Sequence, residues 1–277
     1  MENSLVWYFA YGSNMSSAVM ARRGIKPIDA KNVVINTHIL VFDVFGVPFT
    51  EPAMAGIKQR PADHSEPSVH GVAYLLSASD YNRLKVSEGA GTGYREVMLD
   101  AEVVGGLGDL DQGPAKRRGT SDVPGTVDGV VSRRILRGEA AVSNPTLTVS
   151  TLVARHPFHP TPPPLPSLRY MNLLIDGAVE RAFPETYLLY LQSLPTYTAP
   201  ELNRLHEFCA VRMFLGFWRP ILVFVMKRIK AKADPDEDNA SAWAAATVNI
   251  LFRTMWVYHD AVHRKIWRCD GGRSTAQ

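Results

Sequence analysis

Two short stretches in the first third of the chain carry residue types that could do chemistry. The first is Tyr11-Gly12-Ser13-Asn14, which follows an aromatic, apolar run. Where a strand ends in a tight polar turn and a helix begins, free backbone N–H groups surround one point, and they can bind a carboxylate or phosphate. The sequence therefore indicates an anion-binding turn at residues 11–14. An ordinary strand-to-helix connection is the alternative.

Glu88 is the side chain that we expect to carry the chemistry. It lies between the end of a short helix and the glycine-rich stretch 89–93, where a carboxylate can point into a cavity floored by backbone. A carboxylate in an apolar pocket holds its proton more tightly than in water, which suits a general base near neutral pH. The alternative is a solvated glutamate in a loop.

Two other patterns carry less weight. His259 and His263 echo the HExxH pattern of zinc sites, but Asp260 is too short to replace the usual glutamate and no third ligand is evident. We expect both histidines to pack within a helix, and we predict no metal site. The glycines of 89–93 follow a helix and open a strand, which is the reverse of the order in a dinucleotide-binding fingerprint.

A sheet with short helices must position these residues. Ser77 and Ser167 are placed to cap helices, and another helix follows Pro184. Residues 105–129 are rich in Gly, Asp and Pro and predict a surface insertion. Apolar runs predict strands over residues 5–10, 54–58, 69–76, 94–104, 127–136 and 146–154, and one or two strands over 33–44.

From residue 196 onward the sequence pattern predicts helices. Apolar runs at 213–218, 221–226 and 240–252 are separated by arginines and by the acidic stretch 234–238. Each run is well short of the roughly 18–20 residues that a membrane crossing needs, so we do not expect membrane contact. We expect a helical extension packed on the preceding domain, with an interfacial amphipathic anchor as the alternative.

Composition limits the possible classes of protein. The 277 residues are 46% apolar and 21% charged, which is typical of a globular chain with a large core. A net charge of +3 and dispersed Arg-Arg pairs, such as Arg22-Arg23, predict solvated faces and no nucleic-acid partner. Cys209 and Cys269 give no disulfide framework, and residues 1–4 lack signal-peptide features, so we expect a cytoplasmic protein.

Three blocks together resemble the γ-glutamylcyclotransferase-like family. Residues 9–15 are similar to its YGSN signature. Its second mark is Glu-Gly after a short helix, followed by Gly-x-Tyr and a strand, and Glu88-Gly89 with Gly93–Val97 resembles it. A third block over 166–187 resembles its C-terminal helix. The blocks occur in the family's order over roughly residues 5–195, which makes the match specific.

This resemblance implies a fold, an activity and a set of site residues. The fold is α/β of the α+β type: a small mixed β-barrel or sheet with flanking helices, formed by a catalytic domain over 1–195, with the helical extension over 196–277. The activity is cleavage of γ-glutamyl compounds to 5-oxoproline and a free amine, without metal or organic cofactor. The turn residues would hold the substrate's α-carboxylate, Glu88 would be the general acid/base and two tyrosines would line the pocket: Tyr11, Gly12, Ser13, Asn14, Glu88, Tyr94 and Tyr170.

The sequence departs from the family at Leu152, where a tyrosine is frequent, and this bears on the substrate rather than on the base. The long helical C-terminus resembles fungal members of the family, in particular those of gliotoxin-type epipolythiodioxopiperazine pathways. That likeness implies a glutathione conjugate of a cyclic dipeptide as substrate. The alternatives are a γ-glutamylamine cyclotransferase on the same scaffold and a non-catalytic module that binds a γ-glutamyl ligand.

Overall fold

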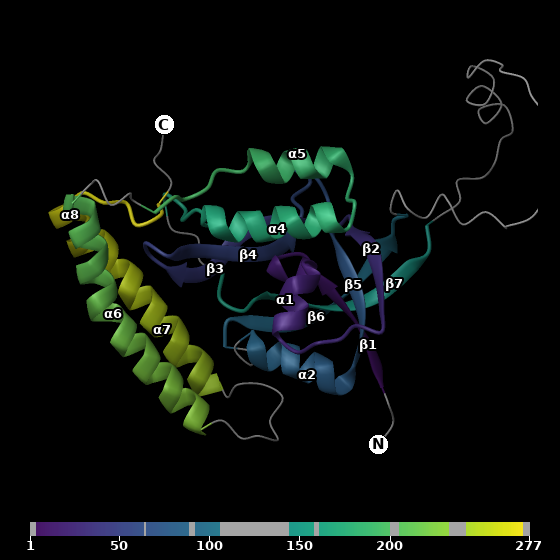
Figure 1. The fold of residues 1–277 in the computed structure, drawn as a ribbon, viewed down its shortest axis with the longest axis horizontal. Helices are drawn as coiled ribbons and strands as arrows, with labels where there is room; N and C mark the ends of the chain where they lie inside the picture. The colour runs from purple at the N-terminus through teal and green to yellow at the C-terminus, as the bar shows by residue number, and fades with distance from the viewer. Residues whose placement is uncertain are drawn as a thin grey trace, which may run out of the picture.

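A closed β-barrel, a projecting hairpin and a terminal helical pair make up the structure (Figure 1). The computed structural model describes residues 4–63, 65–88, 92–105, 144–157, 161–199, 205–232 and 242–273. Some sequence-based expectations lie outside the described residues: the strand over 127–136, nearly all of the insertion over 105–129, the acidic stretch 234–238 and Gly89.

Five strands form the barrel, and the predicted mixed barrel is confirmed. In order around the barrel they are β1 (Leu5–Ala10), β5 (Val69–Ser77), β2 (Asp29–Ile35), β6 (Tyr94–Val103) and β7 (Thr146–Ala154). Neighbours are antiparallel except β7 and β1, which close the barrel as a parallel pair at Tyr8 and Ser150. Closure leaves no free strand edge in the barrel itself. The barrel is therefore a rigid support for the turn that follows β1.

The stretch 33–44, expected as one or two strands, is two strands, because a turn at residues 36–37 divides it. Its second part is β3 (His38–Val47), which pairs with β4 (Glu51–Gln59) in a separate two-stranded hairpin. In Figure 1 this hairpin lies between the barrel and the helical pair. One edge of β4 has no strand beside it, so its backbone groups need other partners.

Short helices cover the barrel and begin where the serine caps were predicted. Ser77 Oγ accepts the Asp80 N–H at 3.2 Å at the start of α2 (Ala78–Ser87), and Ser167 Oγ accepts the Tyr170 N–H at 3.0 Å at the start of α4 (Leu168–Glu180). The other helices among the described residues of this part are η1 (Ser13–Met15), α1 (Ser17–Arg22) and α5 (Glu185–Ser193). Gly177 lets α4 pack closely on η1, because a Cβ there would lie 2.9 Å from Met15 Cβ. The packing of α4 on η1 therefore holds the turn after β1 in place.

The helical pair consists of α6 (Leu205–Lys232) and α7 (Ala242–Tyr258), which continues through a π-helical turn (His259–His263) into α8 (Arg264–Trp267). One face of α6 is buried at intervals of about four residues, at Ala210, Phe214 and Trp218. This spacing is that of a helix with an apolar stripe. The division of the chain between residues 195 and 196 stays a prediction.

The tip of the β3–β4 hairpin joins the helical pair to the barrel. Phe49 has a positive φ of 68° at this tip, and its ring packs on Phe214 (centroids 5.2 Å apart) and His259 (5.3 Å). The Phe49 N–H donates to Gly271 O at 3.1 Å, and Trp256 Nε1 donates to the carbonyl of Gly46 at 3.0 Å. His259 and His263, which were expected to pack within a helix, are both buried in this aromatic cluster.

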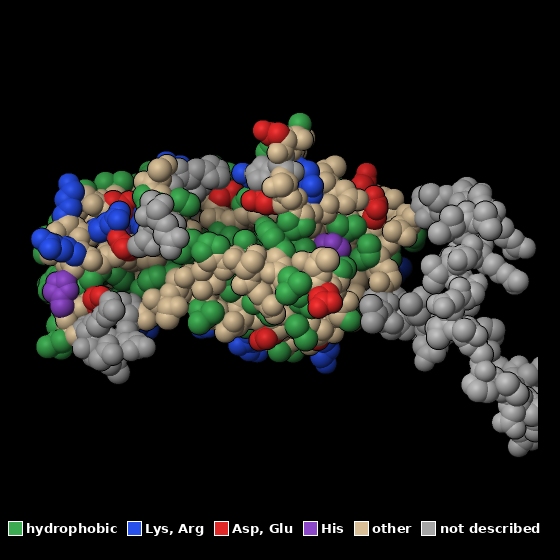
Figure 2. All heavy atoms as spheres, turned by 90° about the horizontal axis from the view of Figure 1, so that it is seen from above, with side chains coloured by type: hydrophobic (Ala, Val, Ile, Leu, Met, Phe, Trp, Pro, Cys, Tyr) green, Lys and Arg blue, Asp and Glu red, His purple; other side chains and the backbone are tan. Residues whose placement is uncertain are grey.

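The expectation of short apolar spans is wrong for α6. Arg219 and Pro220 are exposed and do not interrupt the helix, so Leu205–Ile229 is a continuous helical stretch of 25 residues that contains an 18-residue window with a mean hydropathy of 1.7. By length and composition alone it could cross a membrane. Core helices of soluble proteins that meet the same criteria are mostly buried, whereas 17% of this window is buried here, along the face that carries Ala210, Phe214 and Trp218. On the face shown in Figure 2, hydrophobic side chains and Lys and Arg side chains both gather at the end where this pair lies.

Candidate active site

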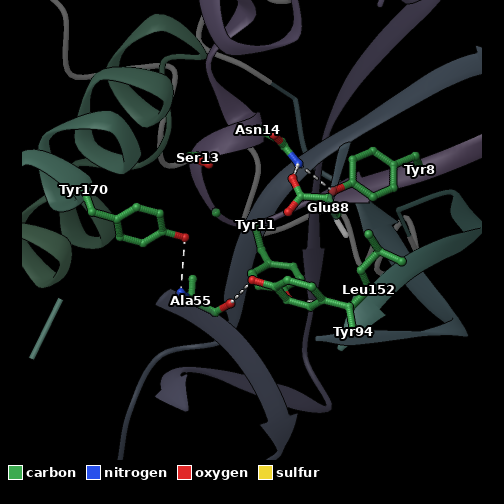
Figure 3. A pocket seen from close by; sticks show the side chains of 10 residues that line it. Tyr8, Tyr11, Ser13, Asn14, Ala55, Glu88, Tyr94, Leu152 and Tyr170 are labelled. Carbon is green, nitrogen blue, oxygen red and sulfur yellow. Dashed lines mark hydrogen bonds between the residues drawn. The ribbon is translucent and has the colours of Figure 1, made fainter. Parts of the chain in front are cut away.

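The predicted site residues meet in one small polar pocket of about 30 Å³ beside the barrel (Figure 3). Strand β1 and the turn after it form one wall, the end of α2 brings Glu88, and β4, β6, β7 and α4 supply the rest. The lining residues are Tyr8, Tyr11, Gly12, Ser13, Asn14, Ala55, Glu88, Tyr94, Leu152 and Tyr170. All of the side chains singled out by sequence are among them, and Tyr8 and Ala55 are additions.

Glu88 follows the last turn of α2 and points into this pocket. Its Oε1 accepts a hydrogen bond from Asn14 Nδ2 at 3.0 Å and lies 2.7 Å from Arg23 Nη2. The side chain is 19% exposed, so it is neither turned out to solvent nor enclosed by hydrocarbon. The expectation of an apolar environment around this carboxylate is therefore wrong, because its immediate neighbours are an amide and a guanidinium.

Arg23 is a site residue that sequence reasoning missed. It was interpreted as part of a solvated Arg-Arg pair, but its side chain is only 22% exposed and its guanidinium reaches both Glu88 and Ser87 Oγ. It stands at the end of α1, next to the end of α2. The guanidinium fixes the Glu88 carboxylate at the edge of the pocket. The sequence offers one clue, which is that the short helix after the turn ends in this arginine.

Asn14 links the turn to the carboxylate. Its Nδ2 donates to Glu88 and also to Tyr8 Oη at 3.1 Å, so both of these hydrogen bonds use the amide nitrogen and neither uses the amide oxygen. Asn14 Oδ1 is buried and has no hydrogen-bond partner among the described residues. A buried acceptor without a donor is costly, so an incoming N–H group at this point would be favoured.

Tyrosine hydroxyls complete the walls of the pocket, as Figure 3 shows. Tyr170 Oη accepts the Ala55 N–H at 3.1 Å, Tyr94 Oη donates to the Ala55 carbonyl at 3.4 Å, and Tyr11 Oη donates to the Leu152 carbonyl. These contacts satisfy the open edge of β4 at Ala55. Sequence reasoning could not find Ala55, because its contribution is made by backbone atoms.

The four pocket tyrosines remain neutral across the physiological range. Burial raises the pKa of Tyr170 to about 12, with the negative charge of Glu88 adding to the shift. Burial likewise raises the pKa of Tyr8, Tyr11 and Tyr94 well above the usual value. Each phenol therefore keeps its proton and can donate it in a hydrogen bond.

Gly12 is needed for space rather than for its backbone angles. Its φ of −111° is open to other residues, but a Cβ at this position would lie 3.1 Å from Tyr170 Oη and 3.5 Å from Ala55 Cβ. A side chain here would therefore enter the pocket. Leu152 lines the same pocket, so the departure from the family's frequent tyrosine falls on the site itself.

Comparison with known proteins identifies the family. Over 281 residues the chain is 34% identical to the γ-glutamyl cyclotransferase gliK of Aspergillus fumigatus. This alignment covers 97% of this chain and 90% of that relative. The chain belongs to the γ-glutamyl cyclotransferase family. It is also 31% identical over 282 residues to the γ-glutamyl cyclotransferase aclK of Aspergillus oryzae, covering 96% of this chain and 90% of the relative.

Two further comparisons concern parts of the chain. The family model described as the AclK C-terminal domain matches residues 206–266, which are the helical pair. A solved structure titled γ-glutamyl cyclotransferase aligns with a TM-score of 0.49 at 17% identity, over 72% of this chain and 92% of that one.

Proposed function

We propose that this protein cleaves the γ-glutamyl amide bond of a glutathione-derived conjugate and releases 5-oxoproline and a free amine. The family membership supports the cyclotransferase activity. The conjugate, and a place in fungal secondary metabolism of the gliotoxin type, are supported by the resemblance to fungal members of the family. The observation that carries the proposal is that the Glu88 carboxylate shares one pocket with the polar turn after β1, with Asn14 Nδ2 only 3.0 Å from Glu88 Oε1.

The reaction needs a single base that gives its proton back. Glu88 takes a proton from the substrate's α-ammonium, and the freed α-nitrogen attacks the γ-carbonyl carbon. The new C–N bond closes the five-membered ring, and the bond from the γ-carbon to the leaving nitrogen breaks as Glu88 gives its proton to that nitrogen. The ring nitrogen still carries one extra proton after closure, and Glu88 takes this second proton and passes it to the released amine, which leaves as its ammonium form. Atoms and charge balance without water or an oxidant, and the carboxylate ends as it began.

Folding the glutamyl chain supplies a large part of the rate. The nucleophile and the carbonyl belong to the same molecule, so a pocket that holds the chain bent turns the attack into a pre-oriented step. Such pre-orientation is worth on the order of 7–11 kcal/mol in favourable systems.

The walls of the pocket have donors and acceptors for each polar group of the substrate. Backbone N–H groups of Gly12 and Ser13 are proposed to hold the α-carboxylate and to steady the developing oxyanion. The unpartnered Asn14 Oδ1 is an acceptor for the α-ammonium. The neutral hydroxyls of Tyr94 and Tyr170 are available to the remaining polar groups.

Replacing the proposed base tests the function. Glu88→Gln should keep the fold and lower 5-oxoproline release from glutathione S-conjugates by about 10²- to 10⁴-fold, because the amide cannot accept the proton. Glu102→Gln, which changes an exposed glutamate on β6, is the matched control and should be unaffected. Near-native turnover by Glu88→Gln would refute the assignment.

Product analysis separates the alternatives. Mass spectrometry after incubation with glutathione S-conjugates, γ-glutamyl amino acids and γ-glutamylamines identifies the class of amine released. A γ-glutamylamine cyclotransferase would turn over the last group in preference. A binding module would give saturable binding and no 5-oxoproline from any of them.

A further inference from the structure

A second cavity adjoins the polar pocket and shares two of its residues, Glu88 and Tyr94. Its volume is about 380 Å³, within the size range of small-molecule sites. The other lining residues come from the hairpin, from residues 92–93, from position 156 and from both helices of the pair: Val44, Val47, Met54, Thr92, Gly93, His156, Leu222, Met226, Val248, Asn249 and Phe252.

The walls of this cavity are made chiefly of hydrocarbon. Val44 and Met54 are cross-strand partners on the hairpin and form one side, while Leu222 on α6 and Phe252 on α7 form the other. Such a surface excludes a solvated, charged group and favours an apolar or aromatic one. The polar pocket, by contrast, is lined mainly by hydroxyl, amide and backbone groups.

The position of Glu88 relates the two cavities to the two halves of a substrate. In the proposed reaction, which this inference rests on, the glutamyl half occupies the polar pocket and Glu88 protonates the nitrogen that leaves. Whatever that nitrogen carries must therefore extend from Glu88, away from the glutamyl half. The apolar cavity begins at this carboxylate.

We infer that the apolar cavity is the subsite for the leaving amine, and that the helical pair selects amines with a bulky apolar substituent. In a glutathione S-conjugate the leaving amine is a cysteinyl unit, and its sulfur substituent reaches several bonds beyond the scissile nitrogen. A substituent of this kind fills a cavity of about 380 Å³, whereas a single small amino acid leaves most of it empty. Leu222, Met226 and Phe252 are then specificity residues that touch the substituent.

Filling the cavity from the α6 side tests the inference. Met226 lines the cavity and is 40% exposed, so a tryptophan at this position can be accommodated without unpacking the helical pair. Met226→Trp should lower kcat/KM for S-hexylglutathione at least about tenfold, because hydrophobic pockets discriminate on this scale. It should leave kcat/KM for γ-glutamylalanine within about twofold of the native value.

Matched variants separate a filled cavity from a damaged fold. Val223→Trp, three positions earlier on α6 and outside the cavity, should change neither substrate. Asn249→Trp fills the cavity from the α7 wall and should reproduce the selective loss. Equal losses on both substrates, or no loss on either, would overturn the inference.

A binding measurement distinguishes this inference from the proposed function. If the native protein releases no 5-oxoproline from any compound, the proposed reaction fails. Calorimetry then still decides the subsite: S-hexylglutathione should bind at least about tenfold more tightly than glutathione, and Met226→Trp should abolish the difference. Equal affinity of the native protein for the two compounds would contradict an apolar subsite.

Discussion

The two cavities that meet at Glu88 are built in opposite ways. The polar pocket measures about 30 Å³ and is held by a closed barrel, and its hydroxyls and amides are mostly paired with one another. The apolar cavity measures about 380 Å³ and lies between a hairpin and two helices, and its walls are chiefly hydrocarbon. The polar pocket suits a group that is the same in every substrate, and the apolar cavity suits recognition of a substituent by its shape.

If the two proposals hold, chemistry and selectivity are carried by separate parts of the chain. Residues before 195 contain the proposed base and the turn, whereas the family model for residues 206–266 matches the part that forms one wall of the apolar cavity. Changes in the barrel should therefore affect all substrates alike. Changes at the hairpin tip or in the helices should affect bulky substrates first.

Phe49→Ala should have the largest effect on stability. The buried ring joins the hairpin to the aromatic cluster of the helical pair, and removal of a buried phenylalanine costs about 3–5 kcal/mol. Urea denaturation measures the loss, and S-hexylglutathione turnover should fall before γ-glutamylalanine turnover does. Phe217→Ala, an exposed position on α6, is the control and should cost much less. Equal losses of turnover on the two substrates would contradict a selective role for the helical pair.

Gly12→Val should be the most severe change in the polar pocket after loss of Glu88 itself. Even a Cβ here lies 3.1 Å from Tyr170 Oη, so the longer branches of valine must displace the bent glutamyl group. Misplacement of a reacting group by about 1 Å can cost 10²-fold in rate. We expect a loss of at least that size for every γ-glutamyl substrate, measured as 5-oxoproline release. A loss confined to bulky substrates would contradict the assignment of the polar pocket to the glutamyl half.

Tyr170→Phe should have a smaller effect. The substitution leaves the Ala55 N–H without its partner, and an unsatisfied buried donor costs about 1–3 kcal/mol. Thermal or urea denaturation gives the value. Tyr190→Phe, at a half-buried ring on α5, is the control. A cost for Tyr170→Phe no larger than that of the control would show that this hydroxyl does not support β4.

The pH dependence of stability should show the smallest signal. Tyr170 has a folded-state pKa of about 12, above the value near 10 expected when unfolded. Its contribution to stability is therefore complete below about pH 10 and is lost as the pH rises toward 12, since the unfolded chain loses its proton first. The free energy of unfolding, measured by denaturation at a series of pH values between 8 and 12, should fall less steeply with pH for Tyr170→Phe than for the native protein. Identical slopes would contradict the burial of the phenol.

Local signals predicted most of the barrel and the core of the polar pocket. The serines at 77 and 167 cap helices as expected, and the turn at 11–14 lies beside Glu88 as the three family blocks imply. These features depend on residues close together in the chain or on a motif. The catalytic roles of these residues stay predictions.

Features that depend on long-range contacts were missed. Arg23 looked solvated because no local pattern shows that α1 ends beside α2. Ala55 contributes backbone atoms, which carry no residue-type signal. The continuity of α6 was missed because Arg219 and Pro220 divide its apolar runs in the sequence, while both side chains simply lie on the exposed face of one helix. The apolar cavity could not be foreseen, since it exists only where the helices and hairpin meet.

Strand β4 separates the polar pocket from the apolar cavity, and in the proposed binding mode it lies between the two halves of the substrate. Successive side chains of a strand point to opposite faces, and here Ala55 faces the polar pocket while the neighbouring Met54 faces the apolar one. In this proposal one face of β4 lies beside the glutamyl group, which all substrates share, and the other face lies beside the leaving amine, which differs between substrates. Mutations at positions such as Met54 can therefore redirect the enzyme toward new leaving groups while the ring-closing machinery next to it stays intact.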